Sequence, residues 1–151
     1  MELKKLMVDS KSVWVEFPGL DGFEVEVVNL SRKELTSLRK RCTTQKFDRK
    51  TRQLVENLDE DKFVEEFSRA SIKNWRGLKL QHLETLILID TEGQDLEAEV
   101  NFTAENAEAL VSNSAEFDTW LNEVVFDLDN FRSEPKREVP KKTGGAVSKS
   151  G

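Results

Sequence analysis

His82 is the only histidine in the chain and Cys42 is the only cysteine, so these side chains are the first candidates for acid–base or nucleophilic chemistry. A histidine base needs a nearby nucleophile and a group that orients its ring, and no G-x-S-x-G pattern or similar arrangement accompanies His82. We interpret His82 as a solvent-facing or helix-end residue. Cys42 falls in step with Leu35 and Leu38 on one helical face, which favours burial as a small hydrophobic residue over a role as nucleophile.

A second candidate for chemistry is the acidic segment 89–102, "IDTEGQDLEAEVNF". Its carboxylates at nearly alternating positions belong to Asp90, Glu92, Asp95, Glu97 and Glu99. Calcium prefers such hard oxygen ligands, but the segment lacks the D-x-D-x-D-G order and closing Glu of an EF-hand loop. A solvated charge run is the better interpretation, with attraction of a basic partner as the intermediate alternative. We expect no metal and no cofactor.

Phosphate binding has little support in the sequence. The stretches "PGLDG" and "KTGG" lack the spacing and the strand-to-helix setting of nucleotide-binding loops. The formal net charge is −6, and the five basic and two acidic residues after position 132 leave −9 for residues 1–132. Nucleic acids are bound by clustered Lys and Arg, so an acidic body favours a basic protein partner over nucleic acid.

These residues must be positioned by a small domain, because 151 residues suit one domain with a modest core. We predict a single domain over 1–132 and a flexible basic tail over 133–151, where prolines and glycines replace apolar residues. Residues 13–17 and 23–28 alternate apolar side chains around "PGLDG", which predicts an antiparallel β-hairpin. The spacing of Ser31 and Glu34 indicates a capping box that opens a helix over about 32–43.

The middle of the chain is less regular. Residues 45–56 are typical of either a second small hairpin or an ordered loop. From Asp59, a helix cap, Phe63 and Phe67 recur at helical spacing and lead to Trp75, which we expect to close the core. Gly77 then supplies the positive φ that ends the helix.

The last part of the chain is predicted to be helical. Thr103 caps a helix over 104–112, and a break near Asn113 precedes a second, amphipathic helix. Its apolar positions at offsets of three and four are Phe117, Trp120, Leu121, Val124, Val125, Leu128 and Phe131. The fold class is therefore α+β, with an N-terminal antiparallel hairpin packed on a mostly helical domain. Phe63, Phe67, Trp75, Gly77 and Phe117 are the expected structural residues.

Location can also be inferred from residue types. A single cysteine excludes an internal disulfide, and no Cys/His set exists for structural zinc. No cleavable export signal and no apolar run of about 20 residues are recognisable. We expect a protein of a reducing cytoplasm, with no membrane partner.

The order of these motifs resembles that of the tail assembly chaperones of long-tailed, siphovirus-type bacteriophages. After the hairpin come "LSRKEL", "FSRASIKNWRGLKL" and "VNFTAENAEALVSNSAEFDTWLNEVV", so the resemblance covers about residues 12–131. Its sharpest points are "WRGL" at 75–78 and "NFT" at 101–103, followed by "EN" at 105–106. The acidic stretch 90–99 departs from the commoner family pattern, and no binding residue is carried over from the family.

The resemblance implies a non-catalytic protein of the host cytoplasm that is absent from the mature virion. It would bind and solubilise the tape measure protein and recruit tail tube protein subunits, alone or as a homo-oligomer. The resemblance also implies a frameshift-extended form, for which Lys141 and Lys142 suit the junction.

From the physical properties of the chain, we expect a partner-binding surface made of Trp120 and Phe126 together with the five acidic residues of 90–99, suited to an amphipathic, partly basic helix. The competing interpretations are a minor structural tail protein retained in the virion and an acidic adaptor that imitates nucleic acid. An enzyme is supported only weakly, by His82 and the carboxylate cluster.

Overall fold

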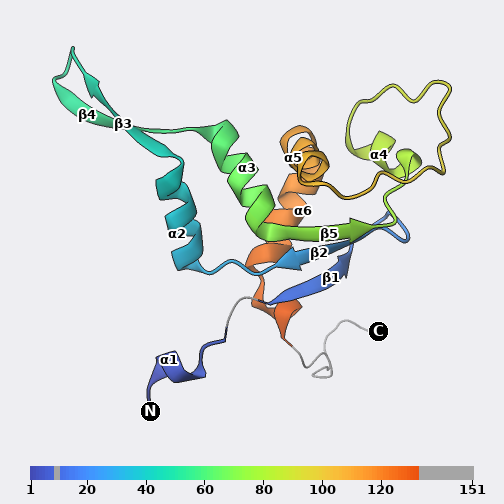
Figure 1. The fold of residues 1–151 in the computed structure, drawn as a ribbon, viewed down its shortest axis with the longest axis horizontal. Helices are drawn as coiled ribbons and strands as arrows, with labels where there is room; N and C mark the ends of the chain where they lie inside the picture. Colours follow the sequence, from blue (N-terminus) through green and yellow to red (C-terminus); the bar gives the residue numbers. More distant parts are fainter. Residues whose placement is uncertain (9–10, 133–151) are drawn as a thin grey trace.

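A computed structural model describes residues 1–8 and 11–132 of the chain (Figure 1). In chain order its elements are α1 (Leu3–Leu6), β1 (Ser12–Glu16), β2 (Glu24–Val28), α2 (Arg32–Arg41), β3 (Thr43–Asp48), β4 (Gln53–Leu58), α3 (Glu60–Ser71), β5 (Ile72–Arg76), α4 (Leu80–Leu86), α5 (Ala104–Asn113), α6 (Ala115–Phe126) and the 3₁₀ helix η1 (Leu128–Phe131). Helices combined with antiparallel sheets confirm the α+β class. The predicted flexible tail, 133–151, lies outside the described residues.

A three-stranded antiparallel sheet in the order β1-β2-β5 forms the base of the fold. Its first two strands are the predicted hairpin, in which Val13 lies opposite Val27 and Val15 opposite Val25. Because side chains alternate across a strand, these valines share one face of the sheet, and Val25 and Val27 are fully buried. The opposite face carries Trp14, which remains partly exposed.

The third strand corrects a prediction. Helical spacing predicted that the helix beginning after Asp59 would continue to Trp75, but α3 ends at residue 71 and β5 follows. Trp75 pairs with Val25 of β2, which places the indole on the valine face. Gly77 has a φ of +75°, as expected, but it follows a strand rather than a helix. Pairing with β2 outweighs the local helical pattern, because strand formation depends on tertiary context.

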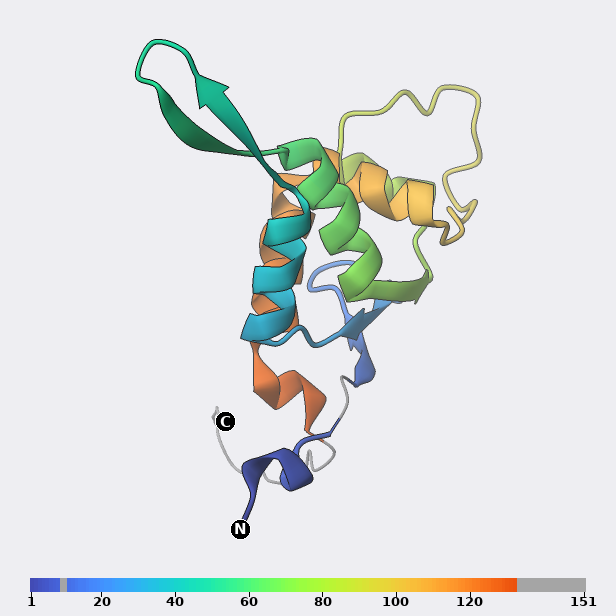
Figure 2. The same ribbon diagram turned by 60° about the vertical axis from the view of Figure 1, so that its left-hand side comes forward.

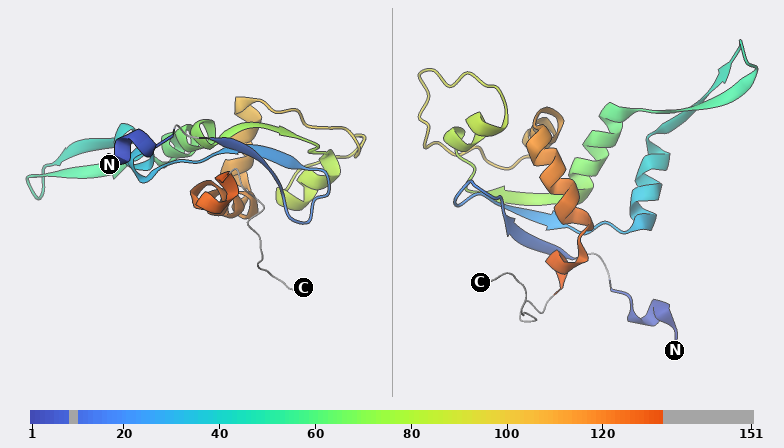
Figure 3. Two further views of the ribbon diagram at one scale, coloured as in Figure 1. Left: turned by 90° about the horizontal axis from the view of Figure 1, so that it is seen from below. Right: turned by 180° about the vertical axis from the view of Figure 1, so that it is seen from behind.

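Helices cover the valine face of the sheet. α3 and α6 both contact β2, and α6 runs across the strands (Figure 3). Asn29 ties the sheet to α6, since its side-chain amide donates to the Val125 carbonyl at 2.9 Å. The buried core contains Phe17, Phe23, Val25, Val27, Leu30, Leu38, Phe67, Ile72, Trp75, Leu78, Leu86, Ala107, Leu110, Val111, Phe117, Leu121, Val124, Val125 and Phe131.

The helix starts agree with the sequence. Ser31 and Glu34 form the predicted capping box at α2, each side chain accepting from the other's backbone amide. The Asp59 carboxylate accepts from the Lys62 amide at the start of α3, and the Thr103 hydroxyl accepts from the Asn106 amide at α5. Each cap satisfies an amide that has no partner within its helix.

The last predicted helix is interrupted. α6 ends at Phe126, and residues up to Phe131 form a separate 3₁₀ turn whose start is capped by the Asp127 carboxylate. Carboxylates compete with the helical pattern by accepting from nearby backbone amides, which ends helices that apolar spacing alone would continue.

Residues 43–58 form a separate two-stranded hairpin, β3–β4, which we call the arm. The sequence alone is compatible with either a hairpin or an ordered loop over 45–56, and the structure shows a hairpin. The arm extends from the ends of α2 and α3 away from the sheet (Figure 2). None of its residues belongs to the buried core.

Candidate functional site

His82 lies half-buried in the first turn of α4. Its Nδ1 atom accepts a hydrogen bond from the Lys79 backbone amide at 3.2 Å. The ring nitrogen therefore satisfies an amide that has no partner within the helix, so the imidazole serves as a cap. This position agrees with the helix-end interpretation.

Cys42 is buried at the end of α2, 1% exposed. Burial, and secondarily the charge of Glu66, raise the pKa of the thiol above its ordinary value, while the opposing effects of Lys62 and Arg41 are smaller. A thiol with a raised pKa is protonated at neutral pH and is a poor nucleophile. The position fits the predicted role as a small hydrophobic residue.

The five acidic residues of 90–99 are exposed, and several serve their own loop. The Asp90 and Asp95 carboxylates accept from backbone amides two residues ahead, at 3.0 and 2.9 Å. Glu97 forms an ion pair with Lys79 at 2.8 Å, which raises the pKa of that ammonium through the hydrogen bond and the charge. Within residues 1–8 and 11–132, no three His, Cys, Asp or Glu side chains gather where they could hold a metal ion.

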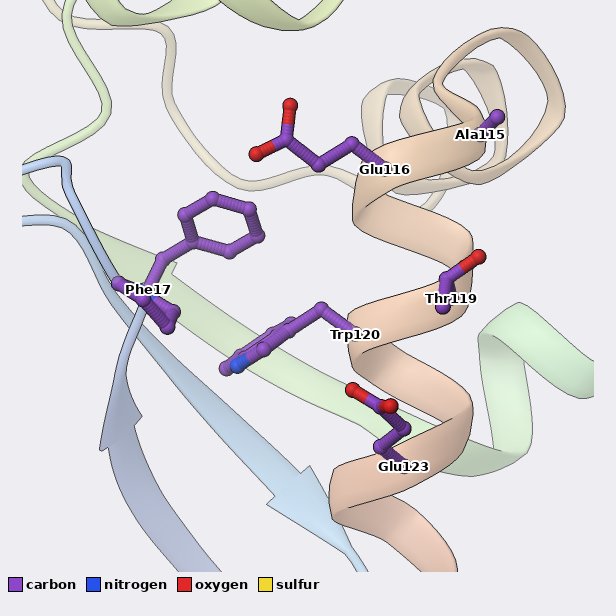
Figure 4. A pocket seen from close by; sticks show the side chains of 7 residues that line it. Phe17, Ala115, Glu116, Thr119, Trp120 and Glu123 are labelled. Carbon is purple, nitrogen blue, oxygen red and sulfur yellow. The ribbon is translucent and has the colours of Figure 1, made fainter.

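A surface pocket lies between α6 and the turn that joins β1 to β2 (Figure 4). Its volume is about 450 Å³, and it is lined by Phe17, Pro18, Ala115, Glu116, Thr119, Trp120 and Glu123. We call it the Phe17–Trp120 pocket. The two rings meet edge to face with centroids 4.9 Å apart, and Phe117 lies beneath them at 5.6 Å from the Trp120 ring. The floor of the pocket is therefore aromatic and supported by the core.

The rim of the pocket is acidic. Glu116 and Glu123 stand on α6 on either side of Trp120, and both side chains are exposed (Figure 4). Neighbouring Asp118 is half-buried; burial raises the pKa of its carboxyl, and a hydrogen bond from Asn122 opposes that shift. An apolar floor with carboxylates at its edge suits a side chain that is apolar along its length and basic at its tip, or an apolar residue next to a basic one.

The predicted partner surface is not one surface. Trp120 lines the Phe17–Trp120 pocket, whereas Phe126 lies elsewhere on α6 and stacks on Phe67 of α3 at 6.2 Å. Six positions along a helix correspond to a rotation of about 240°, so these two side chains cannot share a face. None of the five acidic loop residues lines the pocket. The carboxylates beside Trp120 are instead Glu116 and Glu123, which the sequence interpretation missed.

The expected structural residues are mostly internal. Phe67, Trp75 and Phe117 are buried, and Phe63 is half-buried beside Phe67. The Trp75 indole donates to the Val100 carbonyl at 2.8 Å, which fastens the end of the acidic loop to the sheet.

Gly77 lies against the β1–β2 turn. A Cβ atom at position 77 would lie 2.0 Å from the carbonyl oxygen of Gly22, so only glycine fits there without movement.

Charge is unevenly distributed along the chain, which the net charge of the whole chain does not show. Residues 32–58, which contain α2 and the arm, carry nine basic and three acidic side chains, a net charge of +6. Residues 59–132 carry six basic and eighteen acidic side chains, a net charge of −12. A second pocket, at the base of the arm, has Arg39 and Lys40 in its lining and a volume of about 570 Å³. The acidic body therefore has a basic extension.

No protein-family model, curated protein or solved structure matches this chain. No helix within the described residues is long and apolar enough to span a membrane.

Proposed function

We propose that this protein is a non-catalytic tail assembly chaperone of a long-tailed bacteriophage, which binds the tape measure protein in the host cytoplasm. The observation that carries the proposal is the Phe17–Trp120 pocket. Its aromatic floor and its two carboxylates suit an apolar segment that also bears Lys or Arg. The order of sequence motifs is the second support, because it resembles that of this class of chaperone.

The proposed chemistry is reversible binding. Apolar area on the floor contributes affinity, and the charge of residues 59–132 increases the rate of encounter with a basic client. Recruitment of tail tube protein and a frameshift-extended form remain parts of the proposal that follow from the resemblance alone.

Co-expression tests the pocket. The probe is the tape measure protein, which the proposal requires to be a long, coiled-coil-like protein encoded beside this chain, and the measured quantity is its soluble fraction. Glu116→Lys with Glu123→Lys should lower that fraction severalfold, because the rim would then repel a basic client. Glu92→Lys with Glu99→Lys changes the net charge equally within the exposed loop and should leave the soluble fraction near that of wild type. A folded rim variant that still solubilises the client fully would reject the pocket.

Phe126 gives a second control. Phe126→Ser alters an exposed aromatic residue of the same helix away from the pocket, so client solubility should be unchanged. If Phe126→Ser lowered the soluble fraction of the client and the rim variant did not, the client would bind the side of α6 that faces α3 instead of the Phe17–Trp120 pocket.

An acidic adaptor that imitates nucleic acid is favoured by one observation, the net charge of −12 on residues 59–132. Such a protein would compete with DNA for a basic enzyme, whereas a chaperone would not. Particle composition separates the remaining alternative, since a minor tail protein stays in purified virions and a chaperone is absent from them.

A further inference from the structure

The arm exposes apolar side chains that no other described element covers. Phe47 on β3 lies opposite Leu54 on β4, and their side chains are 60% and 66% exposed. Val55, on the other face of the ribbon, is 46% exposed. A two-stranded ribbon standing alone is only marginally stable in water. An exposed cross-strand pair at the far end of such a ribbon is typical of a surface that another chain covers.

The arm is also basic. Lys46, Arg49, Lys50 and Arg52 lie on it, with Asp48 and Glu56 as its acidic residues. Three of the four basic residues belong to the turn at the tip, next to the Phe47–Leu54 pair. The partner must therefore offer an apolar depression with carboxylates beside it. A nucleic acid would match the basic residues but would leave the apolar pair without a complementary surface, so the chemistry favours a protein.

The Phe17–Trp120 pocket of the same protein has this combination, with its aromatic floor and the Glu116 and Glu123 rim. The arm and the pocket of one chain do not meet, because the arm extends away from α6 (Figures 1 and 3). A second copy can supply the missing half.

We propose that the arm of one copy docks in the Phe17–Trp120 pocket of a second copy. Phe47 and Leu54 contact the aromatic floor, and Arg49 and Arg52 approach the rim carboxylates. The contact is heterologous, since two different surfaces meet. The first copy keeps a free pocket and the second copy keeps a free arm, so further copies can add. Only the end of a ribbon is buried, so the association is weak and concentration-dependent. It is independent of the proposed client, although the two would compete for the pocket.

Sedimentation velocity of the purified full chain, treated with nuclease, tests the proposal. Wild-type protein should show species larger than the monomer that grow with concentration. The arm variant, Phe47→Ser with Leu54→Ser, and the rim variant, Glu116→Lys with Glu123→Lys, should each be at least tenfold weaker in self-association. All four residues are exposed at their side chains, so both variants should keep the wild-type circular dichroism spectrum and unfolding midpoint.

Mixing the two variants is the decisive experiment. The arm variant keeps an intact pocket and the rim variant keeps an intact arm, so an equimolar mixture should form a dimer that neither forms alone. Leu88→Ser, at a fully exposed leucine outside the arm, and Glu92→Lys with Glu99→Lys are matched controls that should associate like wild type.

Three results would overturn the proposal. The first is a wild-type chain that stays monomeric at low salt and high concentration. The second is a mixture that stays monomeric, or a rim variant that self-associates like wild type, which would indicate arm-to-arm contact. The third is a short DNA duplex retained by wild type and lost by the arm variant, which would assign the arm to nucleic acid. Because no client is present in these measurements, their failure leaves the chaperone proposal standing, and the co-expression result is judged separately.

Discussion

Gly77 is the residue whose identity the backbone constrains most. Its φ is +75°, and a Cβ atom would meet the Gly22 carbonyl oxygen at 2.0 Å. Gly77→Ala should lower the free energy of unfolding by about 2–4 kcal/mol, through the left-handed conformation and the clash together. Gly93 has almost the same φ, +76°, with open space around it, so Gly93→Ala should cost only about 1–2 kcal/mol. Urea denaturation of both variants measures the difference, and equal losses would contradict the clash.

Trp75 is the residue that fastens the acidic loop to the sheet. Trp75→Phe removes the indole N–H and leaves the Val100 carbonyl without that donor, so we expect a loss of about 1–3 kcal/mol in unfolding free energy. Hydrogen exchange at the Val100 amide, which donates to Leu78, should also become faster. Trp14→Phe, at a partly exposed indole on the outer face of the sheet, is the matched control and should have a smaller effect.

Cys42 should give stability a pH dependence at the alkaline end. Burial, and secondarily the charge of Glu66, raise the pKa of the folded thiol above its ordinary value, so the folded chain holds this proton more tightly than the unfolded chain does. Above about pH 9 the unfolded thiol ionises first, and the free energy of unfolding should fall as pH rises. Lysines titrate in the same range, so the measurement is the difference between wild type and Cys42→Ala from pH 7 to 10. A difference independent of pH would contradict the raised pKa.

The sequence identified one residue of the pocket better than it identified the neighbours of that residue. The sequence predicts that Trp120 binds a partner, and the structure places Trp120 in the lining of a pocket. Phe17, more than a hundred positions earlier, was assigned only to a strand, because nothing local in the chain indicates that the β1–β2 turn meets α6. The acidic contribution was assigned to the densest run of carboxylates, whereas Glu116 and Glu123 gain their place from helical geometry.

At the level of elements, the helix caps can be predicted from the sequence, whereas the pairing of β5 with β2 cannot. Ser31, Asp59 and Thr103 each satisfy an amide within three residues, so the signal is contained in a short stretch of sequence. Residues 72–76 continue the apolar spacing of a helix, yet they become β5 because β2 offers an unpaired edge next to them. The local sequence around residues 72–76 contains no information about the edge of β2, so it cannot predict this strand.

The arm should be dispensable for folding. No residue of β3 or β4 belongs to the core, and the Asp59 amide and the Cys42 carbonyl already meet at 2.8 Å at its base. Replacing residues 44–57 with a short Gly-Ser linker should change the free energy of unfolding by no more than about 1 kcal/mol, because closing a loop of similar length costs little. Thermal denaturation of the shortened chain measures this. Loss of a cooperative transition would mean that the arm contributes to the core after all.

For the whole molecule, segregated charge predicts a strong dependence on ionic strength. Residues 32–58 and 59–132 carry +6 and −12, so copies should attract when arm faces body. Raising salt from about 50 mM to about 500 mM shortens the Debye length severalfold and should weaken self-association at least tenfold. Sedimentation at both ionic strengths measures the change, and association that strengthens with salt would indicate a purely apolar contact.

The last long helix, α6, covers the central sheet, and this arrangement determines when the domain can fold during synthesis. Phe17, directly after β1, stacks on Phe117, and Asn29, directly after β2, donates to the Val125 carbonyl, about a hundred positions later in the chain. While the ribosome is still translating the middle of the message, α6 has not yet been made and cannot cover the β1–β2 hairpin. The domain should therefore complete its folding only once α6 has left the exit tunnel.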